Sequence, residues 1–263
     1  MNLFLIGSVI FSLFVSEFSQ AESLKLCALE EDQPRSSRQT ETGVDIEFAK
    51  SIAKDLGQPL SIVWVPSRKK IVELEDSDLP LGRLIRGNCD LIGSVPGSEA
   101  LGPFRSRINL SRPYYGMAFE LVGPPKTPQS LKELRSTTVA VQLQTFSHLI
   151  LQKLEIPLVT ALTTKDAFRM IGMEKAEAAL VWGPDLGPLG LKPLGGFKSP
   201  QALRWNAHFA MRKNDSRIKQ ISDYLGKKLH SGSAREILKR YGVPLHRPFE
   251  TVSNVLSRTT IDF

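Results

Sequence analysis

The sequence has little of the chemistry on which common enzyme classes depend. Its two cysteines, Cys27 and Cys89, lie far apart and form no CxxC pair, so a thiol nucleophile or a metal pair has weak support. It also lacks a GxSxG sequence, an HExxH sequence and a phosphate-binding glycine loop. The enzymatic alternative is a catalytic site in which folding brings a histidine and an acidic residue together, and its candidates are His148 and Asp185. We predict a non-enzymatic protein without a metal site.

The chain also lacks the pattern of a nucleic-acid-binding surface. Its formal net charge is +7, but the basic residues stand in short, scattered groups such as Arg68–Lys70 and Lys227–Lys228. No aromatic residues are interleaved with these groups, as a surface that binds nucleic-acid strands requires. The charge therefore favours an acidic partner or a negatively charged cell envelope over nucleic acid.

Long apolar runs are missing after residue 21. The first 21 residues are apolar from Leu3 to Val15 and end in Ser19-Gln20-Ala21, which is typical of a cleaved export signal. The run has roughly thirteen apolar residues, fewer than the ~20 of a spanning helix. It is not preceded by Lys or Arg, and no cysteine marks the cleavage point for lipid attachment. We expect a soluble monomer in the periplasm.

Two cysteines in an exported protein most simply form one disulfide, because the compartment is oxidising. Residues 24–29 alternate like a strand, and residues 89–95 form an apolar strand of the kind that is buried in a parallel sheet. Cys27 and Cys89 would then lie in one sheet. A bridge between them is therefore geometrically reasonable.

The order of elements predicts an α/β protein of two lobes. A strand, a loop, a helix over 44–57 and a strand over 60–65 open the chain, and a second α/β unit begins near residue 118. Strand-like crossings near 116–120 and 206–210 join two parallel or mixed sheets through a two-strand hinge. We assign lobe 1 to residues 22–117 plus 206–242, lobe 2 to 118–205 and a C-terminal tail to 243–263. The ligand cleft is expected between the lobes, at strand ends and helix N-termini.

Four motifs follow one another along the chain, GNCDLIGSVPG at 87–97, SRPYY at 111–115, SLKELRSTTVAVQ at 130–142 and FAMRKND at 209–215. In this order they resemble the type II periplasmic solute-binding proteins of family 3, which include polar-amino-acid receptors. The resemblance implies the two-lobed type II fold. It also implies a receptor for an amino acid or a similar small polar solute, with an ABC permease as partner.

The two cysteine motifs and the sequence AALVWGPDLGPL at 178–189 carry a second likeness. Through them the chain looks most like the members of that family that are associated with quinoprotein methanol and alcohol dehydrogenases. The resemblance implies a non-enzymatic accessory of a PQQ-dependent dehydrogenase. Such a protein would bind a small ligand, the dehydrogenase or its cytochrome c partner. It would bind no cofactor itself, and its link to PQQ would be indirect.

An amino-acid receptor needs an arginine for the ligand carboxylate and an acid for its ammonium group. The usual arginine position falls on Phe104, with Arg105 and Arg107 beside it, and the acid position is Trp182, with Asp185 three residues on. This mismatch weakens the expectation of an ordinary amino-acid ligand.

The other candidates for the ligand cleft come from strand ends and helix starts. Tyr114 and Tyr115 either stack on a ligand or pack in the hinge, and aromatic residues at a strand entry favour packing for at least one. Thr145 and Ser147 begin a helix, where capping and anion binding are compatible. Trp64 and Trp182 each lie near the end of a predicted strand, where a tryptophan can belong either to the pocket wall or to the core. The remaining candidates follow strands: Glu30, Ser94 and Pro96.

Overall fold

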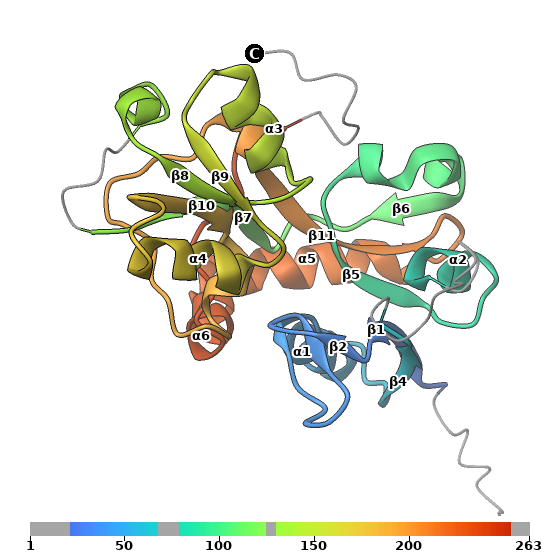
Figure 1. Cartoon of the computed structure of the whole chain (residues 1–263). Coiled ribbons are helices and arrows are strands. Elements are labelled where there is room, and N and C mark those ends of the chain that lie inside the picture. The colour runs from blue at the N-terminus through green and yellow to red at the C-terminus, as the bar shows by residue number, and fades with distance from the viewer. Residues whose placement is uncertain (1–21, 68–78, 125–129, 254–263) are drawn as a thin grey trace, which may run out of the picture.

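The computed structural model describes residues 22–67, 79–124 and 130–253 (Figure 1). The predicted export signal and the end of the C-terminal tail lie outside these ranges. No helix within the described ranges is long and apolar enough to cross a membrane. These ranges also contain no cluster of three His, Cys, Asp or Glu side chains that could hold a metal ion.

Lobe 1 is built on parallel strands whose connections include helices. The alternating pattern at 24–29 and the run at 60–65 form β1 and β4 with the predicted bounds, and they pair in parallel from Leu24 with Leu60 to Leu29 with Val65. The predicted helix is α1, and Gly57 follows it with a φ of 67°, in the left-handed region that glycine tolerates at a helix end. The elements of this lobe are β1 (Leu24–Leu29), β2 (Glu31–Asp32), β3 (Ser36–Ser37), α1 (Val44–Asp55), β4 (Leu60–Val65), α2 (Pro80–Ile85), β5 (Leu91–Val95), the 3-10 segment Ser98–Arg107 and β6 (Ile108–Leu110).

Lobe 2 repeats the alternation of strand and helix on a smaller scale. Its strands β8 and β9 pair in parallel, and β10 pairs in parallel with β8. A 3-10 turn at Glu133–Ser136 precedes these strands in the chain. The other elements are β8 (Val139–Gln142), α3 (Phe146–Lys153), β9 (Leu158–Ala161), α4 (Thr164–Gly172), β10 (Ala178–Trp182) and the 3-10 turns Gly183–Leu186 and Gln201–Leu203.

Two long antiparallel strands, β7 (Tyr115–Val122) and β11 (Arg204–Arg212), join the lobes (Figure 1). The first half of β11 pairs with β7, and its second half pairs with β5 and β6 of lobe 1. The second half of β7 pairs with β10 of lobe 2. The two sheets therefore continue into one nine-stranded ladder, in the order β4-β1-β5-β11-β7-β10-β8-β9 with β6 paired to β11. The architecture is the two-lobed mixed α/β fold that was predicted.

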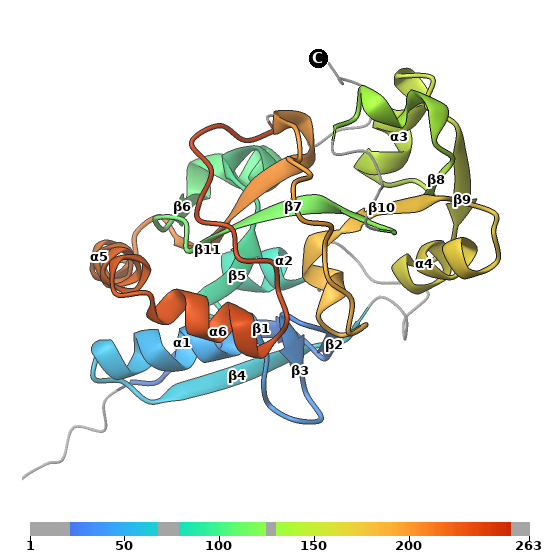
Figure 2. The same cartoon turned by 90° about the vertical axis from the view of Figure 1, so that its left-hand side faces the viewer.

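Two helices follow β11 and pack on lobe 1. Helix α5 (Arg217–His230) contacts α6 (Ser233–Arg240), and both contact α1, as Figure 2 shows. The sequence Ser233-x-x-Glu236 is typical of a capping box, but α6 starts one residue earlier than that motif requires. Its N-cap is Gly232, in the left-handed conformation, and no side chain caps the helix.

The residues after α6 form a strap across the hinge, and we use this name for residues 244–253. The main-chain carbonyl of His246 accepts a hydrogen bond from the Gly116 amide at 3.0 Å. The Nε2 atom of the His246 ring lies 2.5 Å from Oε1 of the buried Glu120. Asn206 forms two hydrogen bonds with the main chain of Phe249, at 2.8 and 2.9 Å. The strap thus binds both hinge strands (Figure 2). The polar composition of this segment had indicated only a tail.

The close approach of the strap to β7 requires glycine at position 116. A Cβ atom there would lie 2.7 Å from the Arg247 carbonyl oxygen and 2.7 Å from the Phe249 ring. We therefore expect Gly116→Ala to lower the free energy of unfolding by about 1–3 kcal/mol, the usual cost of overpacking. Gly172→Ala is the matched control, since its Cβ would meet nothing within 4 Å at the end of α4. Urea unfolding that gave both variants the same stability would contradict this packing.

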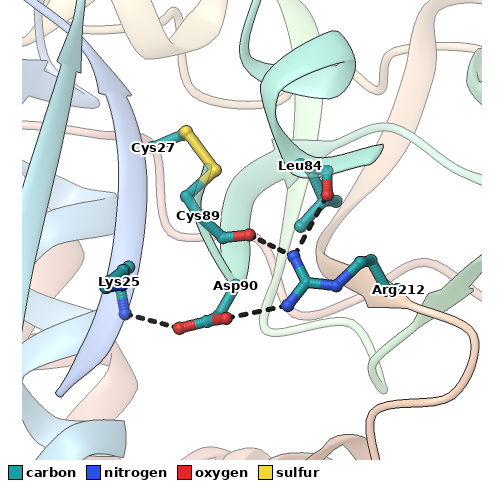
Figure 3. The surroundings of a disulfide bond; sticks show 6 residues. All are labelled: Lys25, Cys27, Leu84, Cys89, Asp90 and Arg212. Atoms are coloured by element: carbon teal, nitrogen blue, oxygen red, sulfur yellow. Dashed lines mark hydrogen bonds and ion pairs between the residues drawn. A yellow bond between two sulfur atoms is a disulfide. The ribbon is translucent and has the colours of Figure 1, made fainter. Parts of the chain in front are cut away.

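The disulfide predicted from the sequence is present and connects neighbouring strands of lobe 1. Cys27 in β1 and Cys89 just before β5 are bridged, with their Cα atoms 5.7 Å apart (Figure 3). The carboxylate of Asp90, next to the disulfide, accepts hydrogen bonds from the main-chain amide of Lys25 at 3.0 Å and from Nη2 of Arg212 at 2.9 Å. Arg212 also donates to the Leu84 carbonyl at 3.1 Å. This cluster fastens β1, β5, α2 and β11 to one another.

Candidate functional site

A cavity of about 290 Å³ lies between the lobes against the two hinge strands, and we call it the inter-lobe cavity. The alternation of side chains along a strand explains how the hinge contributes to it. Met117, Phe119 and Trp205 line the cavity, whereas Gly116, Glu120 and Asn206 on the opposite face meet the strap. Lobe 1 contributes Arg35, Ser94 and Pro96, and lobe 2 contributes Thr145, Phe146 and Trp182.

Four aromatic rings form a continuous wall of this cavity. The ring centroids of Trp182 and Trp205 lie 5.7 Å apart, and Phe119 lies 5.2 Å from Trp182. Phe146 extends the wall, with its centroid 5.2 Å from Trp205. The rings meet at inclined angles rather than stacking in parallel, a geometry that aromatic pairs favour and that fixes their positions. The wall offers flat apolar surface to whatever enters.

Trp205 carries a buried hydrogen-bond donor in the wall of the cavity. Its side chain is 3% exposed, and its indole Nε1 has no hydrogen-bond partner among the described residues. A buried donor without an acceptor costs about 1–3 kcal/mol. The indole N–H of Trp205 is therefore an unsatisfied donor within the wall of the cavity.

The start of α3 forms the lobe 2 side. Thr145 is the N-cap, and its hydroxyl donates to the Gln142 carbonyl at 2.7 Å and accepts from the His148 amide at 3.3 Å. Ser147 is fully buried with its Oγ 2.8 Å from the Thr145 Oγ1. The first amides of a helix have no acceptor within that helix, and the helix dipole favours negative charge there. This end of the cavity favours an acceptor or an anion.

Arg35 forms the lobe 1 side and comes from the short β2–β3 hairpin. Its Nη2 donates to Asp32 Oδ1 at 2.5 Å, and its side chain is 35% exposed. A guanidinium carries five N–H donors, so one carboxylate does not exhaust it. Arg35, Ser94 and Pro96 also line a neighbouring hollow of about 520 Å³ in lobe 1, so the two spaces meet at these residues.

Beneath Ser94 lies a buried polar cluster centred on Asp45 of α1. The Asp45 carboxylate accepts the Tyr114 hydroxyl at 2.6 Å and the Ser94 hydroxyl at 2.9 Å. Ser94 has a φ of 53°, a left-handed conformation that strains a residue other than glycine, and its amide donates to the Tyr114 hydroxyl at 2.8 Å. The cluster holds the floor of the cavity in place.

Burial dominates the protonation of this cluster. It raises the pKa of Asp45 to about 6, although bonds from Tyr114 and Ser94 and the nearby Arg35 charge act in the opposite direction. Burial, followed by the Asp45 charge, also raises the pKa of Tyr114 and of Tyr115 above the ordinary range. Both tyrosines therefore stay neutral and donate hydrogen bonds.

Four of the residues predicted for the cleft line the inter-lobe cavity, and they come from both lobes. They are Ser94, Pro96, Thr145 and Trp182.

The other predicted residues lie outside the wall of this cavity. The two tyrosines are fully buried in the hinge, with Tyr114 stacked on Phe209 at 4.6 Å. Trp64 packs against the core from β4. The remaining predicted residues are Glu30, which binds Arg38; Arg105 and Arg107, which are exposed on the 3-10 segment; Ser147, which is buried behind Thr145; and Asp185, which accepts the Thr164 hydroxyl at 2.9 Å.

Five residues of the cavity wall are absent from the sequence-based predictions. Strand alternation could have found Met117, Phe119 and Trp205 once β7 and β11 were known to pair. Met117 and Phe119 lie two positions apart on β7 and so share a face, and Trp205 is the partner of Met117 on β11. Phe146 directly follows a predicted cap. Arg35 carries no sequence signal, because only the fold of the hairpin brings it to the cavity.

Comparisons with solved structures show the fold. The L-cystine solute receptor of Neisseria gonorrhoeae in the unliganded open conformation matches with a TM-score of 0.70 and 16% identity, over 87% of this chain and 95% of that chain. The second substrate-binding domain of a putative amino acid ABC transporter from Streptococcus pneumoniae matches with a TM-score of 0.66 and 19% identity, over 83% and 99%. The ancestral amino acid-binding protein AncCDT-1, a precursor of cyclohexadienyl dehydratase, matches with a TM-score of 0.53 and 20% identity, over 83% and 94%.

No family model and no curated protein matches the sequence. The similar structures show that the chain has the two-lobed fold of periplasmic solute-binding proteins.

Proposed function

We propose that this protein is a periplasmic receptor that binds a small solute in the inter-lobe cavity and delivers it to an ABC permease. The observation that carries the proposal is the cavity itself, which receives side chains from both lobes and from the hinge. A ligand that contacts both lobes stabilises their closed arrangement, because it binds that arrangement better than the open one. Two of the similar structures are named as a solute receptor and as a domain of a transporter, which supports this choice.

A non-enzymatic role is part of the proposal. The two residues considered for a catalytic site serve other contacts. The ring Nδ1 of His148 accepts the Gln144 amide at 3.3 Å, and Asp185 binds Thr164. Neither residue lines the inter-lobe cavity. The similarity to a dehydratase precursor keeps turnover as an outcome to be tested, and loss of turnover on replacing Asp185 would establish it.

Support for a quinoprotein dehydrogenase stays a prediction from sequence motifs. The names of the similar structures support the transport receptor, whereas a cavity for a small ligand fits both roles. Gene neighbours separate the two roles, since permease and ATPase genes favour transport, whereas dehydrogenase and cytochrome c genes favour the accessory role. A pull-down that recovered the dehydrogenase or its cytochrome would support the accessory role directly.

Thermal unfolding in the presence of metabolites tests the receptor proposal. A solute at a hundred times its dissociation constant adds about 2.7 kcal/mol to stability, which raises Tm by roughly 5–10 °C for a chain of this size. The panel should contain amino acids, organic acids, sugars and polyamines. We expect at least one class to shift Tm, and Trp182→Ala should abolish that shift. Trp64→Phe is the matched control, because Trp64 lies outside the cavity. A panel without any shift would contradict the proposal.

A further inference from the structure

We infer that the solute is a small carboxylate with a flat apolar body and without an ammonium group. This inference rests on the proposed receptor function and specifies the chemical class of its ligand. Three features of the inter-lobe cavity carry it: the direction of its hydrogen-bonding groups, the absence of an acidic side chain among its described lining residues, and its size.

The polar side chains that line the cavity from the two lobes are Arg35, Ser94 and Thr145, and the Ser94 hydroxyl already donates to Asp45. Arg35 brings a guanidinium from the β2–β3 hairpin, and the first amides of α3 begin at Phe146. The indole N–H of Trp205 is buried without a partner in the described part of the chain, within the part of the wall that β11 forms. The Thr145 hydroxyl already donates to a main-chain carbonyl. Hydrogen bonds from a guanidinium or to a charged acceptor are stronger than those between neutral groups. The site is thus complementary to an anionic acceptor.

No acidic side chain is among the described residues that line the cavity. Glu31 and Asp32 line the neighbouring hollow of lobe 1 and not this cavity, and Asp32 is paired with Arg35. Asp45 accepts the hydroxyls of Tyr114 and Ser94. An ammonium group would lose water without gaining a carboxylate, and its charge would lie in the same cavity as the Arg35 guanidinium. Aromatic faces can hold cations, so the direct comparison of an acid with an amine is required.

The apolar part of the ligand follows from the wall and the volume. Four aromatic rings are available for contact, and about 290 Å³ is at the small end of the roughly 300–1,000 Å³ typical of ligand pockets. One ring with a short acidic side chain fits these limits.

Three probes that differ by one group test the inference by isothermal titration calorimetry of the full chain. They are 3-phenylpropanoate, L-phenylalanine, which adds the ammonium group, and 2-phenylethylamine, which keeps the ammonium and lacks the carboxylate. We expect 3-phenylpropanoate to bind about ten-fold or more tightly than phenylalanine, and phenylethylamine to show no binding. Equal or tighter binding of either ammonium compound would overturn the inference, as would the absence of binding by all three.

Two variants connect the result to the donors. Trp205→Phe keeps an aromatic ring and removes the indole N–H, so the affinity for 3-phenylpropanoate should fall about ten-fold. The urea midpoint should not fall, because the removed donor has no partner among the residues that the structure describes. Arg35→Gln should weaken binding at least as much. Arg38→Gln is its matched control, since Arg38 lies in the same hairpin region, pairs with Glu30 and does not line the cavity. Equal affinities of all three variants and the unmodified chain would contradict the inference.

The outcomes separate the ligand class from the receptor function. If 3-phenylpropanoate fails but another metabolite of the thermal panel binds, the inferred class is wrong and the receptor proposal stands. If no member of either set binds, the receptor proposal fails as well.

Discussion

Removing the disulfide is expected to lower the free energy of unfolding by about 4 kcal/mol. The bridge joins residues that are 62 positions apart, and closing a loop of this length restricts the unfolded chain by about that amount. Cys27 and Cys89 are both buried at the junction of β1 and β5, beside Asp90 and Arg212. Loss of the bridge therefore acts on the centre of lobe 1. Denaturant unfolding of the Cys27→Ala, Cys89→Ala and double variants measures the effect.

The pattern among these variants is diagnostic. Either single substitution breaks the whole bridge, so each single variant should lose nearly as much stability as the double variant. Independent thiols would behave differently, because the losses of contacts at separate sites add. Additive losses of about 1 kcal/mol each would contradict a disulfide in the native protein.

Replacing Asp45 with asparagine is expected to stabilise the protein near pH 7, by about 3 kcal/mol relative to the unmodified chain. The pKa of Asp45 is about 6 in the folded protein against 3.8 in the unfolded chain, because burial disfavours the charge. Between these values the folded state binds more protons, so stability falls as the pH rises through this window. A difference of about two pKa units corresponds to roughly 3 kcal/mol. Asparagine carries no charge and keeps an oxygen to accept the Tyr114 and Ser94 hydroxyls.

Urea unfolding at intervals from pH 4 to pH 8 measures this effect. The difference in stability between Asp45→Asn and the unmodified chain should grow from pH 4 to about pH 6 and then stay constant. Subtracting the two curves removes the contribution of the other titrating groups, which both proteins share. Parallel curves over the whole range, or a variant that loses stability most at high pH, would contradict the protonation described here.

Local patterns sufficed for much of the fold. Apolar alternation predicted β1, and an apolar run predicted β4, each to its terminal residues, while the periodicity of residues 44–57 predicted α1. The two hinge crossings were recognisable because buried strands stand out from the surrounding loops. The Ser233-x-x-Glu236 pattern is typical of a capping box with Ser233 as the N-cap. In the structure the N-cap of α6 is Gly232, in the left-handed conformation, and Ser233 is the first residue of the helix.

Local sequence patterns predicted fewer residues of the inter-lobe cavity, because the cavity is formed by contacts between segments that are distant in the sequence. Trp205 meets Phe119 only through the pairing of β11 with β7, and Trp182 reaches both through β10. Trp182 was among the predicted residues, whereas Arg35 looked like one charged residue in a polar loop. The strap was hidden for the same reason, since its binding depends on the missing side chain of Gly116.

The central claim is that a small solute binds between the lobes against Trp182 and Trp205. Tryptophan emission of the Trp64→Phe protein measures this most directly, because the two remaining tryptophans both line the inter-lobe cavity. Titration with the solute that shifts Tm, or with 3-phenylpropanoate, should change the emission in a saturable way that Trp182→Ala weakens. Saturable binding that leaves the emission of both tryptophans unchanged would place the ligand elsewhere and contradict the account.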